Sequence, residues 1–235
     1  MIGFDEIGGA VSKRTLKIYW LVDTSLSMSG EKIATVNRAI KACIAPLRDA
    51  AEDNHEANMT VRTMKFSTGA MWHTEETKIN EFEWYDLSAN GYTDTGAALK
   101  LMATELTMEK MGSRALPPVI ILMSDGNATD NYEEGLKELL AQRWGKKAVR
   151  IAIAIGEDVD LSALSQFCSN PGENPPLVAD RASELVAFIK WASVEVSKSV
   201  SHSVIGEGAS NVTLPPLPEK QVMIGANDDD DDDIF

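Results

Sequence analysis

Residues 16–28 read Leu-Lys-Ile-Tyr-Trp-Leu-Val-Asp-Thr-Ser-Leu-Ser-Met, an apolar run that ends in alternating polar residues. The run Leu16–Val22 is typical of a strand that is buried on both faces. A second apolar run, Val119–Met123, is followed by Ser124-Asp125-Gly126. Stretches with helical periodicity separate such runs along the chain. The sequence therefore predicts an α/β fold, with helices on both faces of a central sheet.

The remaining elements follow from the same two periodicities. We expect further strands at residues 58–66, 70–73, 148–155 and 177–178. We expect helices from residue 30 or 31 to 51, at 97–108 and 160–167, and from about 182 onward, with another that carries Leu136, Leu139 and Leu140. The first two of these strands should form a hairpin around Ser67-Thr68-Gly69. Pro46 lies inside the first helix and should kink that helix or end it early.

Composition narrows the classes of partner. The chain has 235 residues, with 36 Asp and Glu against 22 Lys and Arg, which gives a formal net charge of −14. Nucleic acids and anionic membranes need a cationic surface, so we expect neither as a partner. No secretory signal and no apolar run long enough to span a membrane is visible, so a cytoplasmic location is expected. Cys43 and Cys168 are then expected as reduced, partly buried thiols, with a disulfide as the alternative.

Charge also divides the chain into a domain and a tail. We expect one domain at residues 1–199, and an acidic, mostly extended or disordered tail at residues 200–235. The tail carries eight acidic residues and one lysine, and it ends in six Asp followed by Ile234-Phe235. One interpretation is a solubilising terminus. The other is a recognition segment that contacts a partner's basic groove or supplies an acidic ligand to a metal in another copy.

Polar residues directly after the two apolar strands form a candidate metal site. Alternate residues of an extended turn point the same way, so Asp23, Ser25 and Ser27 can converge. Asp125 follows the second strand, and ligands of open α/β sheets bind beyond the carboxyl ends of strands. A loop at residues 90–96 offers another hydroxyl. Such oxygen ligands suit Mg²⁺, Mn²⁺ or Ca²⁺ alike, and of these we expect Mg²⁺.

These three segments together resemble a von Willebrand factor type A (vWA) domain. The resemblance covers roughly residues 14–198 and implies a Rossmann-like, mostly parallel sheet of six strands with one antiparallel edge strand. It also implies a metal-ion-dependent adhesion site formed by Asp23, Ser25, Ser27, Thr93 and Asp125. Thr93 is chosen over Thr95 because the family's ligand is the first Thr of Thr-x-Thr-Gly. Leu26 stands where the family often has Gly, a departure that removes no ligand.

The resemblance implies metal-dependent protein binding, in which the ion accepts an acidic side chain of a partner. The chain also resembles the bacterial tellurite-resistance-associated (TerY-like) group, which is linked to stress response or phage defence. Members of that group are often accompanied by a protein kinase and a PP2C-type phosphatase. The alternative is a vWA adaptor of an AAA+ ATPase, as in metal chelatases or MoxR-type systems.

The same residues fit other kinds of site less well. A haloacid-dehalogenase-like phosphatase needs a second Asp where Ser25 stands, and neither a Walker lysine pattern nor an EF-hand spacing is present. The three His residues form no spaced pair, so we expect neither a zinc site nor a His base. Because none of these catalytic patterns is present, we expect no enzyme activity. Ser29 and Thr95 could cap the helices that follow them. Asp94 should face solvent or support its loop.

Overall fold

The computed structural model describes residues 13–55, 57–156, 159, 161–201 and 213–218. In it, strand β1 (Arg14–Asp23) lies near the centre of the sheet. The strand order is β3-β2-β1-β5-β6-β7. The other strands are β2 (Ala57–Ser67), β3 (Gly69–Trp72), β4 (Thr77–Lys78), β5 (Val119–Ser124), β6 (Val149–Ile155) and β7 (Leu177–Ala179). Neighbours along this path pair in parallel except β2 and β3. The predicted α/β fold, a mostly parallel sheet with one antiparallel edge strand, is confirmed.

A seventh strand goes beyond the prediction. Strand β4 has two residues and pairs antiparallel with β2, Thr60 facing Lys78 and Val61 facing Thr77. A segment this short has too few residues to show an alternating pattern in sequence. The predicted hairpin is confirmed, since Ser67 pairs with Gly69 across the turn between β2 and β3.

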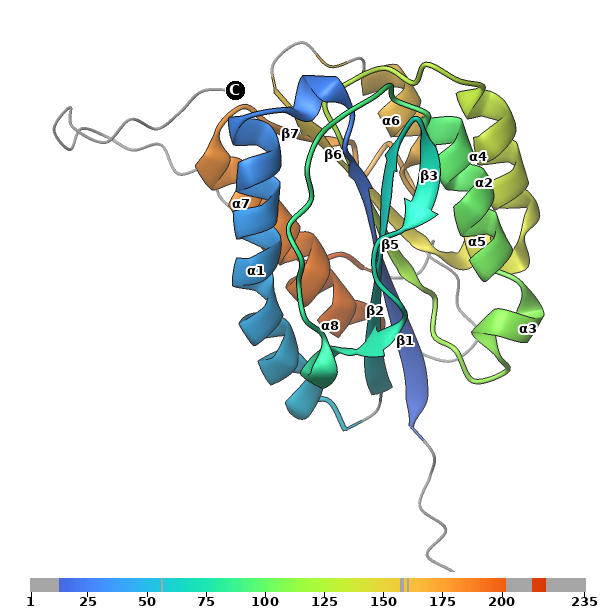
Figure 1. Cartoon of the computed structure of the whole chain (residues 1–235). Coiled ribbons are helices and arrows are strands. Elements are labelled where there is room, and N and C mark those ends of the chain that lie inside the picture. Colours follow the sequence, from blue (N-terminus) through green and yellow to red (C-terminus); the bar gives the residue numbers. More distant parts are fainter. Residues whose placement is uncertain (1–12, 56, 157–158, 160, 202–212, 219–235) are drawn as a thin grey trace, which may run out of the picture.

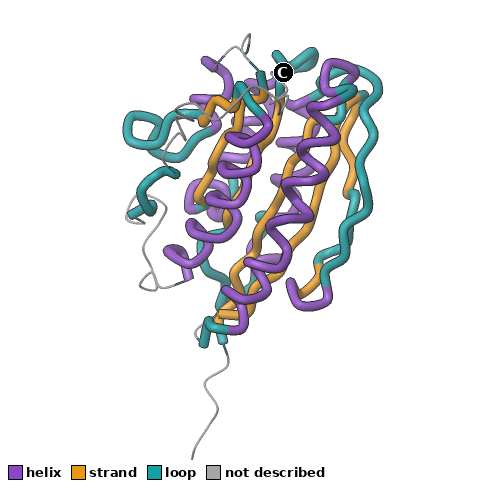
Figure 2. The backbone as a smooth tube through the Cα atoms, turned by 90° about the vertical axis from the view of Figure 1, so that its left-hand side faces the viewer, coloured by secondary structure: helices purple, strands orange, loops and turns teal. Residues whose placement is uncertain are grey.

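Two layers of helices cover the sheet (Figure 1). One layer contains α1 (Glu31–Glu52), α7 (Ala182–Lys190) and α8 (Val196–Ser201), and the other contains α2 (Thr95–Glu105), α3 (Met108–Met111), α4 (Tyr132–Ala141), α5 (Arg143–Lys147) and α6 (Leu161–Phe167). Short 3₁₀ turns lie at Leu26–Met28 and Ile79–Glu81, and a π-helical stretch, Trp191–Glu195, joins α7 to α8. Figure 2 shows the helices of the α1 side in front of the strands.

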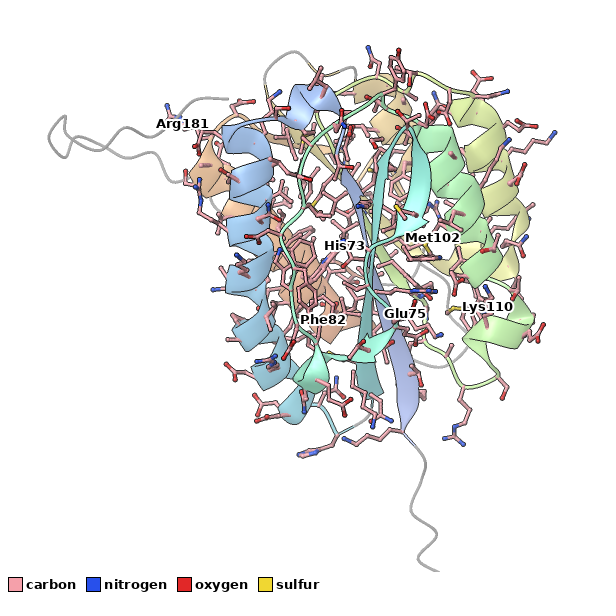
Figure 3. The ribbon with its side chains drawn as sticks, viewed as in Figure 1. His73, Glu75, Phe82, Met102, Lys110 and Arg181 are labelled. Carbon is pink, nitrogen blue, oxygen red and sulfur yellow. The ribbon has the colours of Figure 1, made fainter. Side chains whose placement is uncertain are left out.

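Both faces of the central strand are buried, as its apolar sequence predicts. Trp20 and Val22 pack into the core on the α1 side, whereas Tyr19 and Leu21 pack into the core on the α2 side. In Figure 3, Phe82 marks the first of these cores and Met102 of α2 marks the second. A sheet covered on both sides leaves its strand ends as the place where polar side chains can gather.

Pro46 does not end its helix early. Of the two outcomes expected at this proline, a kink or an early end, the early end is wrong. Helix α1 continues past Pro46 to Glu52. Proline removes the hydrogen bond to the carbonyl four residues earlier, that of Ala42. Ala42 lies on the exposed side of the helix, where water can take that bond, while Cys43 and Leu47 are fully buried against the core. Burial of this face stabilises the helix despite the missing donor.

Other boundaries differ by small amounts. Helix α2 begins at Thr95 and ends at Glu105, before the expected residue 108, and the separate turn of α3 follows it. The last helix was expected as one element, but the π-helical stretch interrupts it. Helix α8 extends to Ser201.

Part of the expected tail lies on the domain. Leu214 packs against the core on the α1 side, and the indole nitrogen of Trp191 donates to the carbonyl of Pro216 at 2.9 Å. Residues 213–218 therefore contact the body of the fold. The Asp run at 228–233 and the final two residues lie outside the described part of the chain.

The two cysteines are free, as expected, but they are more deeply buried than the expected partly buried thiols, and they lie on opposite faces of the sheet. Burial raises the pKa of Cys43 to about 12 and that of Cys168 to about 11. Among the described helices, none is long and apolar enough to cross a membrane.

Candidate metal centre

The carboxyl ends of β1 and β5 lie where the strand order reverses. From β1 the chain passes to β2 and β3 on one side, and later to β5, β6 and β7 on the other. Val22 pairs with Met123 in the parallel register, so Asp23 and Ser124 leave the sheet side by side. Ligand sites of open α/β sheets lie at this kind of switch point. The topology therefore brings two of the three predicted segments together.

Asp23 is fully buried and held in one orientation by two hydrogen bonds. Its Oδ1 accepts from the backbone N–H of Ser25 at 2.8 Å, and its Oδ2 accepts from Ser124 Oγ at 2.6 Å. Burial raises the pKa of Asp23, although the bonds from Ser124 and Ser25 act in the opposite direction. The nearby Asp125 carboxylate adds to this rise of the pKa. A bound cation would relieve both effects, because it stabilises the ionised form.

A chain of hydroxyls links the first segment to Asp125. Ser25 Oγ lies 3.0 Å from Ser27 Oγ, and Ser27 Oγ donates to Asp125 Oδ1 at 2.8 Å. The 3₁₀ turn at Leu26–Met28 brings Ser27 back toward the strand end, and it buries Met28 below. Hydrogen bonds thus connect four of the five predicted ligands in one chain, which runs from Asp23 through Ser25 and Ser27 to Asp125.

Thr93 comes to the same point from the third segment. A Cβ atom built on Gly126 would lie 3.9 Å from Ser27 Oγ and 4.0 Å from Thr93 Oγ1. Both hydroxyls therefore flank the backbone that follows Asp125. The absence of a side chain at Gly126 leaves the space between them open.

Backbone bonds tie the loop that carries Thr93 to the first segment. The N–H of Asn90 donates to the carbonyl of Thr24 at 2.7 Å, and the N–H of Leu26 donates to the carbonyl of Gly91 at 3.0 Å. Asp94 supports the same loop from its other side. This is the second of the two roles expected for Asp94, which were to face solvent or to support its loop. Its carboxylate accepts from the N–H of Gly69 at 2.8 Å and from Thr129 Oγ1 at 3.0 Å.

The capping roles considered for Ser29 and Thr95 are wrong. Ser29 Oγ donates to the carbonyl of Leu26, and Gly30 precedes the first turn of α1. Thr95 is the first residue of α2, and Asp130 caps that helix from another segment. The Asp130 carboxylate accepts from the N–H groups of Gly96 at 2.8 Å and Ala97 at 2.7 Å.

Lys32 and Asp130 are the site's neighbours that the sequence analysis missed. Lys32 Nζ lies 2.7 Å from Asp125 Oδ2, and the side chain of Asp125 is almost fully buried. Lys32 stands in the first turn of α1, so only the fold brings it to Asp125, 93 positions away. Asp130 precedes a helix of its own, and sequence alone would assign it to the start of that helix.

The donor set suits a hard divalent cation. The five side chains offer two carboxylates and three hydroxyls, which are the oxygen ligands that Mg²⁺, Mn²⁺ and Ca²⁺ bind. Within the described ranges, no group of three or more His, Cys, Asp and Glu side chains could hold a metal ion. A site of this kind therefore depends on its hydroxyls as well as its carboxylates.

The comparisons with known proteins agree with this architecture. Residues 17–190 match the family described as von Willebrand factor type A domain. That span covers well over half of the chain and includes every predicted ligand. A search of curated proteins found no match.

Solved structures share the fold at low sequence identity. The pilus adhesin SpaC from Lactobacillus rhamnosus GG matches with a TM-score of 0.62 and 14% identity, over 80% of this chain and 31% of that one. A von Willebrand factor type A protein from Catenulispora acidiphila matches with a TM-score of 0.58 and 14% identity, over 79% and 43%.

A third similar structure is proximal thread matrix protein 1 from the mussel byssus, described with a zinc-occupied MIDAS motif. Its TM-score is 0.55 at 17% identity, over 77% of this chain and 48% of that one. The chain thus spans less than half of the length of each of these three proteins.

Proposed function

Because the chain belongs to the von Willebrand factor type A family, we propose that it is a metal-dependent protein interaction module. Asp23, Ser25, Ser27, Thr93 and Asp125 would hold one divalent cation. The observation that carries this proposal is the buried Asp23 carboxylate beside the linked oxygens of Ser25, Ser27 and Asp125. The Lys32 ammonium compensates only one of the two carboxylates, so the buried pair remains costly unless a further cation binds.

Mg²⁺ is the proposed ion, because the ligands are hard oxygens and three of them are neutral hydroxyls. The zinc named for the mussel protein supports a divalent cation in a site of this family. When bound, the ion would supply a positively charged coordination position for an oxygen from another molecule. The chain's own residues fix that position: Ser124 and the Ser25 N–H orient Asp23, while Ser27 and Lys32 orient Asp125.

The proposed partner ligand is an acidic side chain of another protein. We propose binding rather than catalysis, since the residues around the site orient the two carboxylates and leave neither as a free general base. A phosphatase-like role would instead predict phosphate release from a small phosphoester in Mg²⁺, abolished by Asp23→Asn.

At the level of pathway, we propose a bacterial stress-response or tellurite-resistance type of system with a kinase and a PP2C-type phosphatase as partners. The second candidate is an adaptor of an AAA+ ATPase. The resemblance of the sequence to the TerY-like group favours the first. Native co-purification followed by mass measurement distinguishes them, because a kinase–phosphatase pair and a hexameric ATPase differ greatly in mass.

The direct test is a pull-down from native extract with wild-type chain and Asp23→Ala, each in Mg²⁺ and in EDTA. We expect specific partners only with the wild type in Mg²⁺. Undiminished capture of the same partners by Asp23→Ala in EDTA would overturn the proposal.

A further inference from the structure

We propose that two exposed apolar side chains beside the metal centre, Leu26 and Tyr92, form a docking rim for a particular class of partner segment. That segment carries an acidic side chain followed directly by large apolar side chains. The inference rests on the proposed function, because the acidic side chain would bind the metal. It goes further by assigning specificity to residues that are not ligands.

The rim residues stand out by their exposure. Leu26 is 65% exposed and Tyr92 is 68% exposed, the two highest values among the large apolar side chains of the described residues. Each is next in sequence to ligands: Leu26 lies between Ser25 and Ser27, and Tyr92 precedes Thr93. Large apolar side chains held in water at a binding site are typical of protein interaction surfaces.

The fold ties the backbone segments that carry these two residues together. The N–H of Leu26 donates to the carbonyl of Gly91 at 3.0 Å, which joins the two loops directly at the rim. The N–H of Tyr92 donates to Thr68 Oγ1 at 3.2 Å, so the turn between β2 and β3 supports its backbone. The same turn contacts Gly91, where an added Cβ would approach Thr68 Oγ1 to 2.6 Å. The rim is therefore built on an ordered backbone.

The charge of the site selects an acidic ligand. With both carboxylates ionised around a bound ion, Asp23, Asp125 and the ammonium of Lys32 sum to minus one, and the dication turns this into plus one. A partner carboxylate then gains from both the open metal position and the local charge. An apolar side chain next to that carboxylate would cover Leu26 and Tyr92. Neither feature alone would select a segment with both kinds of side chain.

This chain supplies a suitable probe. Its last residues, Asp233-Ile234-Phe235, place an acidic side chain directly before two large apolar ones. A labelled peptide of residues 226–235 therefore has the proposed chemistry. The same peptide with Ile234→Ser and Phe235→Ser keeps the charge and loses the apolar part.

The experiment measures binding of both peptides to the full chain by fluorescence anisotropy, in Mn²⁺ and in EDTA. The protein variants are Leu26→Ser with Tyr92→Ser, and the control Met108→Ser, an exposed apolar residue in the separate helix α3. Mn²⁺ affinity is measured for each by calorimetry. We expect wild type and Met108→Ser to bind the natural peptide roughly tenfold more tightly than the serine peptide.

We expect the double variant to bind Mn²⁺ as the wild type does and to lose that preference. Equal binding of the two peptides to wild type, or an unchanged preference in the double variant, would overturn the rim while leaving the proposed function intact. Failure of the wild type to bind Mn²⁺ would instead overturn the proposed function itself.

Discussion

Lys32 Nζ lies 2.7 Å from Asp125 Oδ2, while the other oxygen of the same carboxylate accepts a hydrogen bond from Ser27. The ammonium therefore neutralises part of the charge that a metal ion would use. It also fixes the carboxylate in place before any ion arrives. The positive charge of Lys32 should therefore lower the affinity for a metal ion and raise the attraction for a partner's carboxylate.

Replacing Lys32 by Met should strengthen metal binding. Without the ammonium, a dication meets two uncompensated carboxylates, and we expect Mn²⁺ affinity to rise roughly tenfold, about 1.4 kcal/mol. Calorimetric titration at fixed ionic strength measures the change. Lys41→Met is the matched control, because Lys41 is also on α1 and pairs with Asp86 instead. Equal affinities of Lys32→Met and Lys41→Met would show that Lys32 does not influence the ion.

Asp23→Asn should stabilise the metal-free protein. Burial raises the pKa of Asp23 in the folded state, so ionising this carboxyl above its ordinary pKa costs folding free energy. Asn keeps a similar shape without the charge. In EDTA at neutral pH, we expect a higher melting temperature for Asp23→Asn than for the wild type.

The dependence of the melting temperatures on pH tests whether the charge of Asp23 is the cause of this difference. The difference between the two proteins should be largest above the folded-state pKa of Asp23 and should vanish at low pH, where the wild-type carboxyl is also neutral. A lower melting temperature for Asp23→Asn at neutral pH would contradict the account. In Mg²⁺, only the wild type should gain stability, because bound ligand stabilises the native state.

Gly135→Ala should weaken the contact between α2 and α4 and loosen the loop before α2. A Cβ at Gly135 would lie 2.4 Å from the carbonyl oxygen of Gly96, a backbone atom that can move only with its helix. We expect a loss of about 1–3 kcal/mol in the free energy of unfolding. We also expect weaker Mn²⁺ binding, because Thr93 lies just before α2.

Urea denaturation measures the stability change in this variant. Gly172→Ala is the control, since a Cβ there would meet nothing within 4 Å. If Gly135→Ala were as stable as Gly172→Ala, the close approach of the two helices would be excluded.

The two thiols should be unreactive in the native protein. Burial raises the pKa of Cys43 to about 12 and that of Cys168 to about 11, so the reactive thiolate is scarce at pH 8. With Ellman's reagent, we expect almost no release of the coloured thiolate from the folded chain and two equivalents in guanidinium chloride. A rapid equivalent from the folded chain would contradict the burial of one of them.

Much of the fold followed from local pattern. The apolar runs at β1, β5 and β6 and the helical periodicity between them were enough to predict the layered sheet. Pro46 was misjudged because the cost of a missing backbone donor is local, whereas the burial of Cys43 and Leu47 that offsets it is tertiary. The two-residue strand β4 was missed because it has no pattern of its own.

In the candidate site, too, local pattern predicts some residues, and tertiary contacts decide the others. Residue types and spacing suggested Asp23, Ser25, Ser27 and Asp125 as ligands, whereas the family resemblance implied Thr93. The structure brings all three segments to one edge of the sheet. Lys32 and Asp130 act across long sequence separations, on Asp125 and on the start of α2 respectively. Such contacts depend on the register of strands and the packing of helices, which no local pattern encodes.

The central claim is that five side chains hold one dication, those of Asp23, Ser25, Ser27, Thr93 and Asp125. Electron paramagnetic resonance of Mn²⁺ measures this directly, because the signal of free aqueous Mn²⁺ falls as the ion binds. We expect one Mn²⁺ bound per wild-type chain, displaceable by Mg²⁺, and none bound by Asp23→Ala. A free-ion signal unchanged by the wild-type protein, or equal binding by Asp23→Ala, would contradict the account.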